Sequence, residues 1–85
     1  MTDSRIEDEI LRQTAARGPG ASICPSEVAR ALAPEWRPLL GEVRRTAIRL
    51  AQAGRIEILR KGKLIDPAEL KGVVRLRVRH EAPTC

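Results

Sequence analysis

Aromatic side chains are almost missing from this chain, which contains one Trp and neither Tyr nor Phe. Proteins that hold single strands or RNA loops usually stack the bases on aromatic side chains. With Trp36 as the single aromatic residue, the sequence offers no such platform. Among the nucleic acids, duplex DNA is therefore the more natural ligand, read through its grooves and phosphates.

Residues for catalysis and metal binding are also scarce. The one histidine, His80, has no partnered Cys, Ser or carboxylate cluster, and Cys24 and Cys85 lack the spacing of metal ligands. The sequence contains no P-loop, dinucleotide-binding glycine pattern or zinc motif. We expect no enzymatic activity, no catalytic residues, no metal and no cofactor. Reduced thiols are the expected state of the two cysteines, with a disulfide between them as the alternative.

Long apolar runs are missing too, since no stretch approaches the ~20 residues that cross a bilayer. The first four residues show neither the basic start nor the apolar stretch of a secretory signal. We therefore expect no membrane contact and a cytoplasmic protein of bacterial type. A chain of 85 residues with 42% hydrophobic content fits a single domain over 1–85, with a compact core at about 4–79 and a tail at 80–85.

Positive charge is present, and it is concentrated in one part of the chain. The formal net charge is +5, but residues 1–36 carry a balance of −2 and residues 37–85 a balance of +7. A one-sided positive field raises the association rate and affinity for polyanions. Solvated surface lysines and arginines are the competing explanation.

The order of the expected elements is typical of one fold. Pro and Gly at 18–20, Pro25, the bend at 34–36 and Gly54 mark the helix ends. An alternating pattern follows, interrupted by the turn-forming pair at 61–62. We predict an α+β winged helix-turn-helix, three helices with a small antiparallel β-sheet as the wing. The expected helices are 4–16, 25–33 and 38–53, and the expected strands are 55–58, 63–65 and 74–79, with 21–23 as an edge strand.

The third helix has two faces on a helical wheel. Its apolar side and the inward strand positions predict a core of Val28, Leu32, Val43, Ala47, Leu50, Ile56, Ile58, Leu76 and Val78. Glu42, Arg45, Thr46, Arg49 and Gln52 are placed on the opposite, exposed side. Of these, Arg45, Thr46 and Arg49 are the candidate base readers, because Arg can bind guanine bidentately. Glu42 would accept a hydrogen bond from cytosine or form an ion pair with Arg45 or Arg49 on the helix surface.

Further basic residues follow the third helix. Arg60, Lys61 and Lys63 surround a glycine at the wing tip and are candidates for phosphate or minor-groove contact. Arg75, Arg77 and Arg79 line one face of the last strand and would extend the phosphate track. Two structural roles explain these arginines equally well: pairing with Glu57 across the sheet, and preventing aggregation at the edge of the sheet.

Other polar or aromatic residues in this region are given structural roles. Trp36 is expected to be a wedge between the second and third helices, and Arg44 and Asp66 are expected to form an ion pair or cap.

Several segments together resemble a bacterial family of unknown function assigned to the winged-helix class. They are residues 23–32 (ICPSEVARAL), 36–39 (WRPL), 43–44 (VR), 54–56 (GRI), 61–62 (KG), 65–67 (IDP) and 72–77 (GVVRLR). The resemblance spans about 23–77 and implies a winged-helix fold and, by class, DNA binding. It implies no established substrate or partner.

Two functions are compatible with these patterns. The leading one is duplex DNA binding through helix 38–53 and the wing 60–63, as in a transcription regulator, with a homodimer as a means of raising affinity. The alternative is a protein–protein interaction adaptor without nucleic acid contact, which an exposed apolar patch of Leu59 and Val73 would favour. A role with RNA is disfavoured by the missing aromatic residues.

Overall fold

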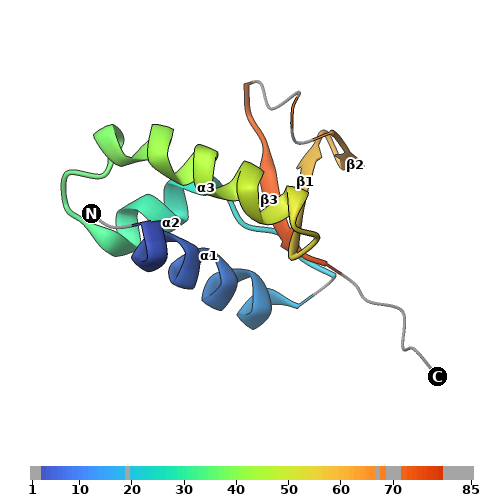
Figure 1. Ribbon diagram of the computed structural model, residues 1–85, viewed down its shortest axis with the longest axis horizontal. Coiled ribbons are helices and arrows are strands. Elements are labelled where there is room, and N and C mark those ends of the chain that lie inside the picture. The colour runs from blue at the N-terminus through green and yellow to red at the C-terminus, as the bar shows by residue number, and fades with distance from the viewer. Residues whose placement is uncertain (1–2, 19, 67, 69–71, 80–85) are drawn as a thin grey trace.

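The computed structural model describes residues 3–18, 20–66, 68 and 72–79. In this part of the chain, helices and strands follow one another in the expected order (Figure 1). The elements are α1 (Asp3–Arg17), α2 (Pro25–Leu32), the 3₁₀-helix η1 (Arg37–Leu39), α3 (Leu40–Gln52), β1 (Ile56–Arg60), β2 (Lys63–Leu64) and β3 (Arg75–Val78). The α+β class, with three α-helices and a small antiparallel sheet in the described residues, is confirmed and is compatible with a winged helix-turn-helix. The expected tail at 80–85 and most of the loop after Asp66 lie outside the described residues.

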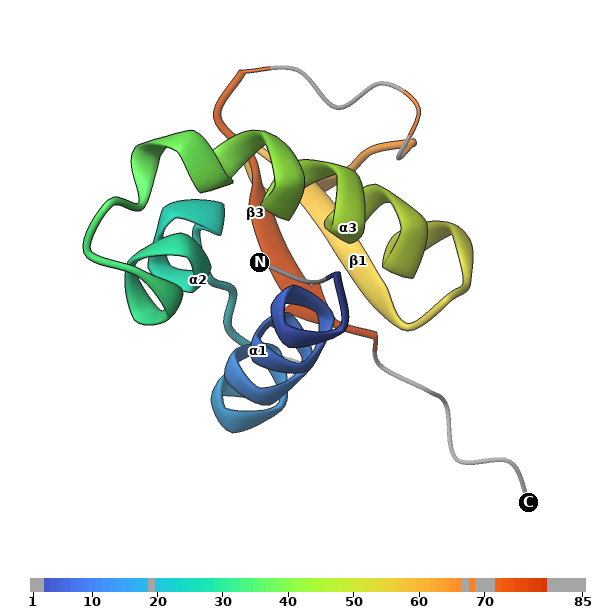
Figure 2. The ribbon, with the colours of Figure 1, turned by 60° about the vertical axis from the view of Figure 1, so that its left-hand side comes forward.

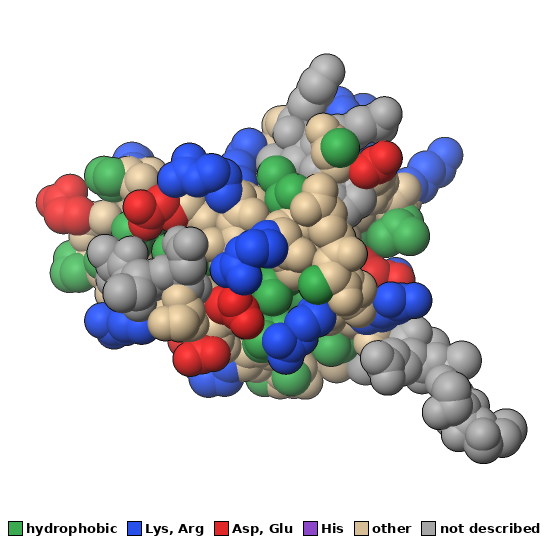
Figure 3. Space-filling model, viewed as in Figure 1, with side chains coloured by type: hydrophobic (Ala, Val, Ile, Leu, Met, Phe, Trp, Pro, Cys, Tyr) green, Lys and Arg blue, Asp and Glu red, His purple; other side chains and the backbone are tan. Residues whose placement is uncertain are grey.

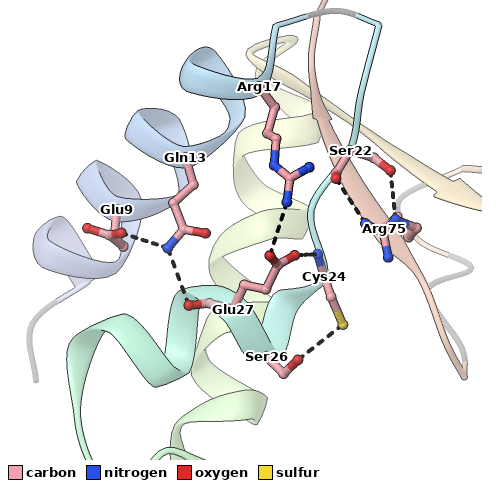
Figure 4. A network of polar contacts seen from close by, with 8 residues as sticks. All are labelled: Glu9, Gln13, Arg17, Ser22, Cys24, Ser26, Glu27 and Arg75. Atoms are coloured by element: carbon pink, nitrogen blue, oxygen red, sulfur yellow. Dashed lines mark hydrogen bonds and ion pairs between the residues drawn. The ribbon is translucent and has the colours of Figure 1, made fainter.

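The start of α2 is held by the side chain of its first acidic residue. Glu27 accepts a hydrogen bond from the backbone N–H of Cys24 at 2.6 Å, and Ser26 Oγ donates to Cys24 Sγ at 3.2 Å (Figure 4). Pro25 occupies the first helical turn, where its missing N–H leaves no backbone bond unmade. The negative charge of this carboxylate also interacts favourably with the positive end of the helix dipole.

The segment expected to be one helix at 38–53 consists of a short 3₁₀-helix followed by an α-helix. Its first turn is η1, and the α-helical geometry begins at Leu40. At the other end, Gly54 has φ +79° and donates to Ala51 O at 3.0 Å, while Arg55 donates to Leu50 O at 2.9 Å. This pair of bonds is a Schellman motif, which requires the left-handed conformation that Gly adopts at low cost.

The sheet has the strand order β2-β1-β3 with antiparallel pairing. Lys61 and Gly62 join β1 to β2 with φ values of +51° and +78°, the positive pair that a type I′ hairpin turn requires. The edge strand expected at 21–23 is reduced to a bridge between Ile23 and Leu76, whose two backbone hydrogen bonds measure 2.7 Å each.

The hydrophobic core lies between the helices and one face of the sheet. Figures 1 and 2 show α1, α2 and α3 on the same side of the β1–β3 pair. Seven of the nine predicted core residues are buried, whereas Leu32 and Val78 are half-buried. The core also includes Ile6 and Ile10 of α1, together with Ile23 and Val74. No helix in the described part of the chain is long and apolar enough to cross a membrane.

Leu59 corrects one expectation about the surface. An exposed apolar patch of Leu59 and Val73 was the feature expected to favour a protein–protein adaptor, but only 7% of Leu59 is exposed, against 82% of Val73. The register places Leu64 and Arg75 directly opposite Leu59 on the two neighbouring strands. A residue in the central strand is flanked on both sides, so it becomes buried even on the sheet face without helices.

Candidate nucleic-acid interface

The exposed side of α3 carries Arg45 and Gln52, as the wheel predicted. The Arg45 guanidinium lies back over the previous turn, where an added Cβ at Gly41 would be 3.5 Å from Arg45 Nη1. Within the residues that the structure describes, Arg45 has no ion pair. Its charge is therefore available to an external anion.

Thr46 is placed wrongly by the sequence prediction, because it is only 3% exposed. On a helix it neighbours Val43 at i−3 and Leu50 at i+4, and both of these are buried. Thr46 therefore belongs to the packed side of α3 and has no access to a base edge.

Arg49 is exposed but shares its charge with the first helix. Its Nη1 lies 3.1 Å from Glu7 Oε2, and Nη1 of Arg55 lies 3.7 Å from the other Glu7 carboxylate oxygen. One carboxylate of α1 thus faces two arginines from α3 and the segment before β1. Glu42, the partner considered from sequence, is half-buried with an Oε2 that has no hydrogen bond in the structure.

The hairpin between β1 and β2 presents three cations. Arg60, Lys61 and Lys63 are all exposed, and in the part of the chain that the structure describes none of them has an ion pair. The positive φ of Lys61 places it within the tight turn itself. A compact turn with three uncompensated charges is well suited to phosphate contact.

Arg44 connects α3 to the segment that precedes β3. Its Nη2 donates to the carbonyl oxygen of Gly72 at 2.9 Å, whereas Asp66 Oδ1 accepts from the backbone N–H of Ala68 at 2.9 Å. Of the two roles expected for Arg44 and Asp66, the ion pair is absent among these described contacts, whereas the bond of Asp66 to a backbone N–H fits the alternative, a cap. Through Arg44, α3 is joined to the connection between the hairpin and the last strand.

The arginines of β3 are engaged in the sheet. Arg75 donates to Ser22 Oγ at 2.7 Å and to the Ser22 carbonyl at 2.9 Å (Figure 4). Arg77 donates twice to Glu57 Oε1, at 2.9 and 2.6 Å, so the cross-strand pairing considered from sequence is confirmed. Both residues lie on strand positions opposite to the buried Leu76, on the face away from the helices. Their guanidinium groups are therefore held by partners within the sheet layer, although Arg75 also lies beside the hairpin residues Arg60 and Lys61.

Sequence reasoning missed a pair of arginines around the one aromatic side chain. The Trp36 ring has the guanidinium carbon of Arg30 at 4.6 Å and that of Arg37 at 4.7 Å from its centroid. Trp36 also packs against the core, as a wedge should. Arg37, next to Trp36 in the sequence, was the available signal, because guanidinium groups favour aromatic faces. Arg30 belongs to α2 and Arg37 to η1, the turn that precedes α3.

The overall charge distribution follows from these contacts. Figure 3 shows Lys and Arg side chains over α3 and around the hairpin, with Asp and Glu side chains interspersed toward α1. On α1, Arg12 donates to Glu9, and this bond lowers the pKa of the Glu9 carboxyl below its ordinary value. Arg12 and Arg17 of α1 are thus paired with acidic residues, as Arg49 of α3 is, whereas Arg45 and the hairpin cations have no ion pair among the described residues.

Comparison with protein families identifies the chain at the level of a family. Residues 3–79 match the family described as "Protein of unknown function (DUF3253)". The chain belongs to this family. A search of curated proteins finds no match. Membership in DUF3253 brings no activity or partner with it, so function must be argued from the side chains themselves.

The chemistry available on this surface is charge and hydrogen bonding. Within the described ranges, no three His, Cys, Asp or Glu side chains gather in a way that could hold a metal ion. What the α3 and hairpin residues offer is a set of guanidinium and ammonium donors on a rigid framework. Such donors bind phosphates and base edges.

Proposed function

We propose that this protein binds duplex DNA, with α3 in the major groove and the β1–β2 hairpin against the phosphates. The observation that carries this proposal is a group of four exposed cations on α3 and the hairpin, Arg45, Arg60, Lys61 and Lys63, none of which has an ion pair among the described residues. The acidic residues of α1 and α2 pair instead with Arg12, Arg17, Arg49 and Arg55.

The proposed roles differ between helix and hairpin. Arg45 projects from the exposed side of an α-helix, the element that the major groove admits, and a guanidinium can bind guanine O6 and N7 together. Lys61 and Lys63 offer point charges at a tight turn and contact phosphates without reading sequence. Arg49 is a secondary contact, because Glu7 competes for its guanidinium.

The biological role that fits such a surface is a transcription regulator in the bacterial cytoplasm, and the proposal includes no catalytic step. A protein–protein adaptor without nucleic acid contact remains the second candidate. Val73 and Leu64, which are 82% and 62% exposed, are the observation in its favour.

Fluorescence anisotropy with a labelled random-sequence duplex of about 20 base pairs tests the proposal. The variant Lys61→Ala/Lys63→Ala should weaken binding to every duplex and reduce the salt slope by about one unit per lost phosphate contact. A matched control is Arg12→Ala/Arg17→Ala, which removes the same charge from α1, where both arginines have acidic partners. Equal losses in the two variants would mean that only net charge matters, and would contradict a defined interface.

A further inference from the structure

A hollow opens beside the hairpin turn on the sheet face away from the helices. Its volume is about 470 Å³, within the range of small-molecule pockets in proteins. Leu59 and Val73 form its apolar part. Residue 73 shares the strand alternation of Arg75 and Arg77, and Arg75 lies opposite Leu59 in the sheet. The hollow therefore belongs to a surface that no helix covers.

The apolar residues of this hollow are unequal in exposure. Leu59 is nearly buried, whereas Val73 is 82% exposed, one of the two large apolar side chains of the described residues left in solvent. Covering Val73 with an apolar group removes that surface from water, at roughly 25 cal/mol per Å². A ligand with an apolar body is thus favoured.

Positive charge surrounds the same hollow. Arg60, Lys61 and Arg75 line it, and among the residues that the structure describes no acidic side chain does. The Arg75 guanidinium is already oriented, since Ser22 accepts hydrogen bonds from its Nε and Nη2. A fixed guanidinium and two uncompensated cations beside an apolar wall are complementary to an anionic group attached to an apolar body.

We propose that this hollow binds a small organic anion, a carboxylate or sulfonate carried on an aromatic or branched aliphatic body. The body lies on Leu59 and Val73, and the anionic group faces Arg60, Lys61 and Arg75. The small volume favours such a molecule over a folded partner. This proposal is independent of DNA binding, and its test contains no DNA.

The probe is 1-anilinonaphthalene-8-sulfonate, an aromatic anion whose fluorescence rises in apolar surroundings. Titration of the full chain should show saturable binding at one site. Val73→Ser and Arg60→Ala/Lys61→Ala should each weaken binding by about tenfold, which is 1.4 kcal/mol. The matched controls are Leu64→Ser and Lys63→Ala, an exposed leucine and a hairpin cation that do not line the hollow. Both controls should keep the affinity of the unmodified protein.

NMR of the unmodified protein gives a second measurement that no folding defect can affect. The probe should shift the amide signals of residues 59–62, 73 and 75 more than those of α3. Equal weakening by the lining variants and their controls, non-saturable binding, or shifts centred elsewhere would overturn the proposal. Shifts at these residues with an acidic, Leu-containing peptide but none with the probe would also overturn it, and would indicate a protein partner.

Discussion

Glu7 of α1 partly compensates the positive charge at the C-terminal end of α3. It faces Arg49 at 3.1 Å and Arg55 at 3.7 Å, so one carboxylate partly compensates two arginines. We predict that Glu7→Gln raises the affinity for duplex DNA several-fold and steepens the salt dependence by about one counterion, because Arg49 becomes free for a phosphate. Anisotropy titrations at two salt concentrations would measure both effects.

Glu9→Gln is the matched control for that prediction. It removes the same charge from the same helix, but Glu9 is engaged with Arg12 and Gln13 within α1. Its effect on DNA binding should be smaller than that of Glu7→Gln. If the two variants gave the same increase, the gain would come from net charge alone and not from the release of Arg49.

Leu50 tests the packing at the centre of α3. It is 2% exposed and belongs to the core with Val43 and Ala47. Leu50→Ala should lower the free energy of unfolding by about 2–5 kcal/mol, because it removes buried methyl groups and leaves a cavity. Urea unfolding measures this change, and a loss below about 1 kcal/mol would contradict the assignment of Leu50 to the core.

Thr46 shows where reasoning on single residues from the sequence fails. We placed it on the exposed side of the wheel, yet it is buried beside the positions of Val43 and Leu50. The helical spacing itself places Thr46 at i+3 from Val43 and i−4 from Leu50, so the prediction misjudged the width of the packed side. The burial of Leu59 was missed for a different reason, since strand alternation gives its face but not its two flanking neighbours.

At the scale of elements, the sequence predicted the existence and order of helices and strands well. The start of α2, the end of α3 and the turn between β1 and β2 were predicted correctly from Pro25, Gly54 and the Lys61–Gly62 pair. Each of these positions has a local backbone requirement that the residue type reveals. The start of α3 was less well predicted, since the 3₁₀ turn of η1 and a regular α-helical turn have similar patterns.

The candidate site could be predicted only in part. Arg45 and the hairpin cations are exposed as expected, whereas Arg49 is paired with Glu7. Side-chain contacts between elements distant in sequence, such as this ion pair and the hydrogen bonds from Arg75 to Ser22, depend on how the elements pack. Composition and local patterns do not determine them.

Helix and hairpin should contribute differently to DNA recognition. Arg45→Ala should reduce discrimination between a preferred site, selected from a random duplex library, and unrelated DNA by about 1–3 kcal/mol. Competition binding measures that difference directly, with Arg12→Ala as the control. If Arg45→Ala weakened all duplexes equally, Arg45 would be a phosphate contact and its assignment as a base reader would be wrong.

At the scale of the whole molecule, positive charge lies where acidic partners are few. The net charge of +5 arises from a second half with a balance of +7, which includes α3 and the hairpin. The single Trp is enclosed between two arginines and packs on the core, so it is a poor stacking platform for bases. Together these features favour duplex DNA over single strands.

The most direct test of this account is a titration of the intact protein with a random duplex at several salt concentrations, alongside single-stranded DNA and structured RNA. We predict a dissociation constant for the duplex of about 10⁻⁴–10⁻⁶ M at physiological salt, with an affinity that falls linearly in log–log form as salt rises. Single-stranded DNA and RNA should bind more weakly. Binding that does not change with salt, or no binding to the duplex at low salt, would contradict the proposed function.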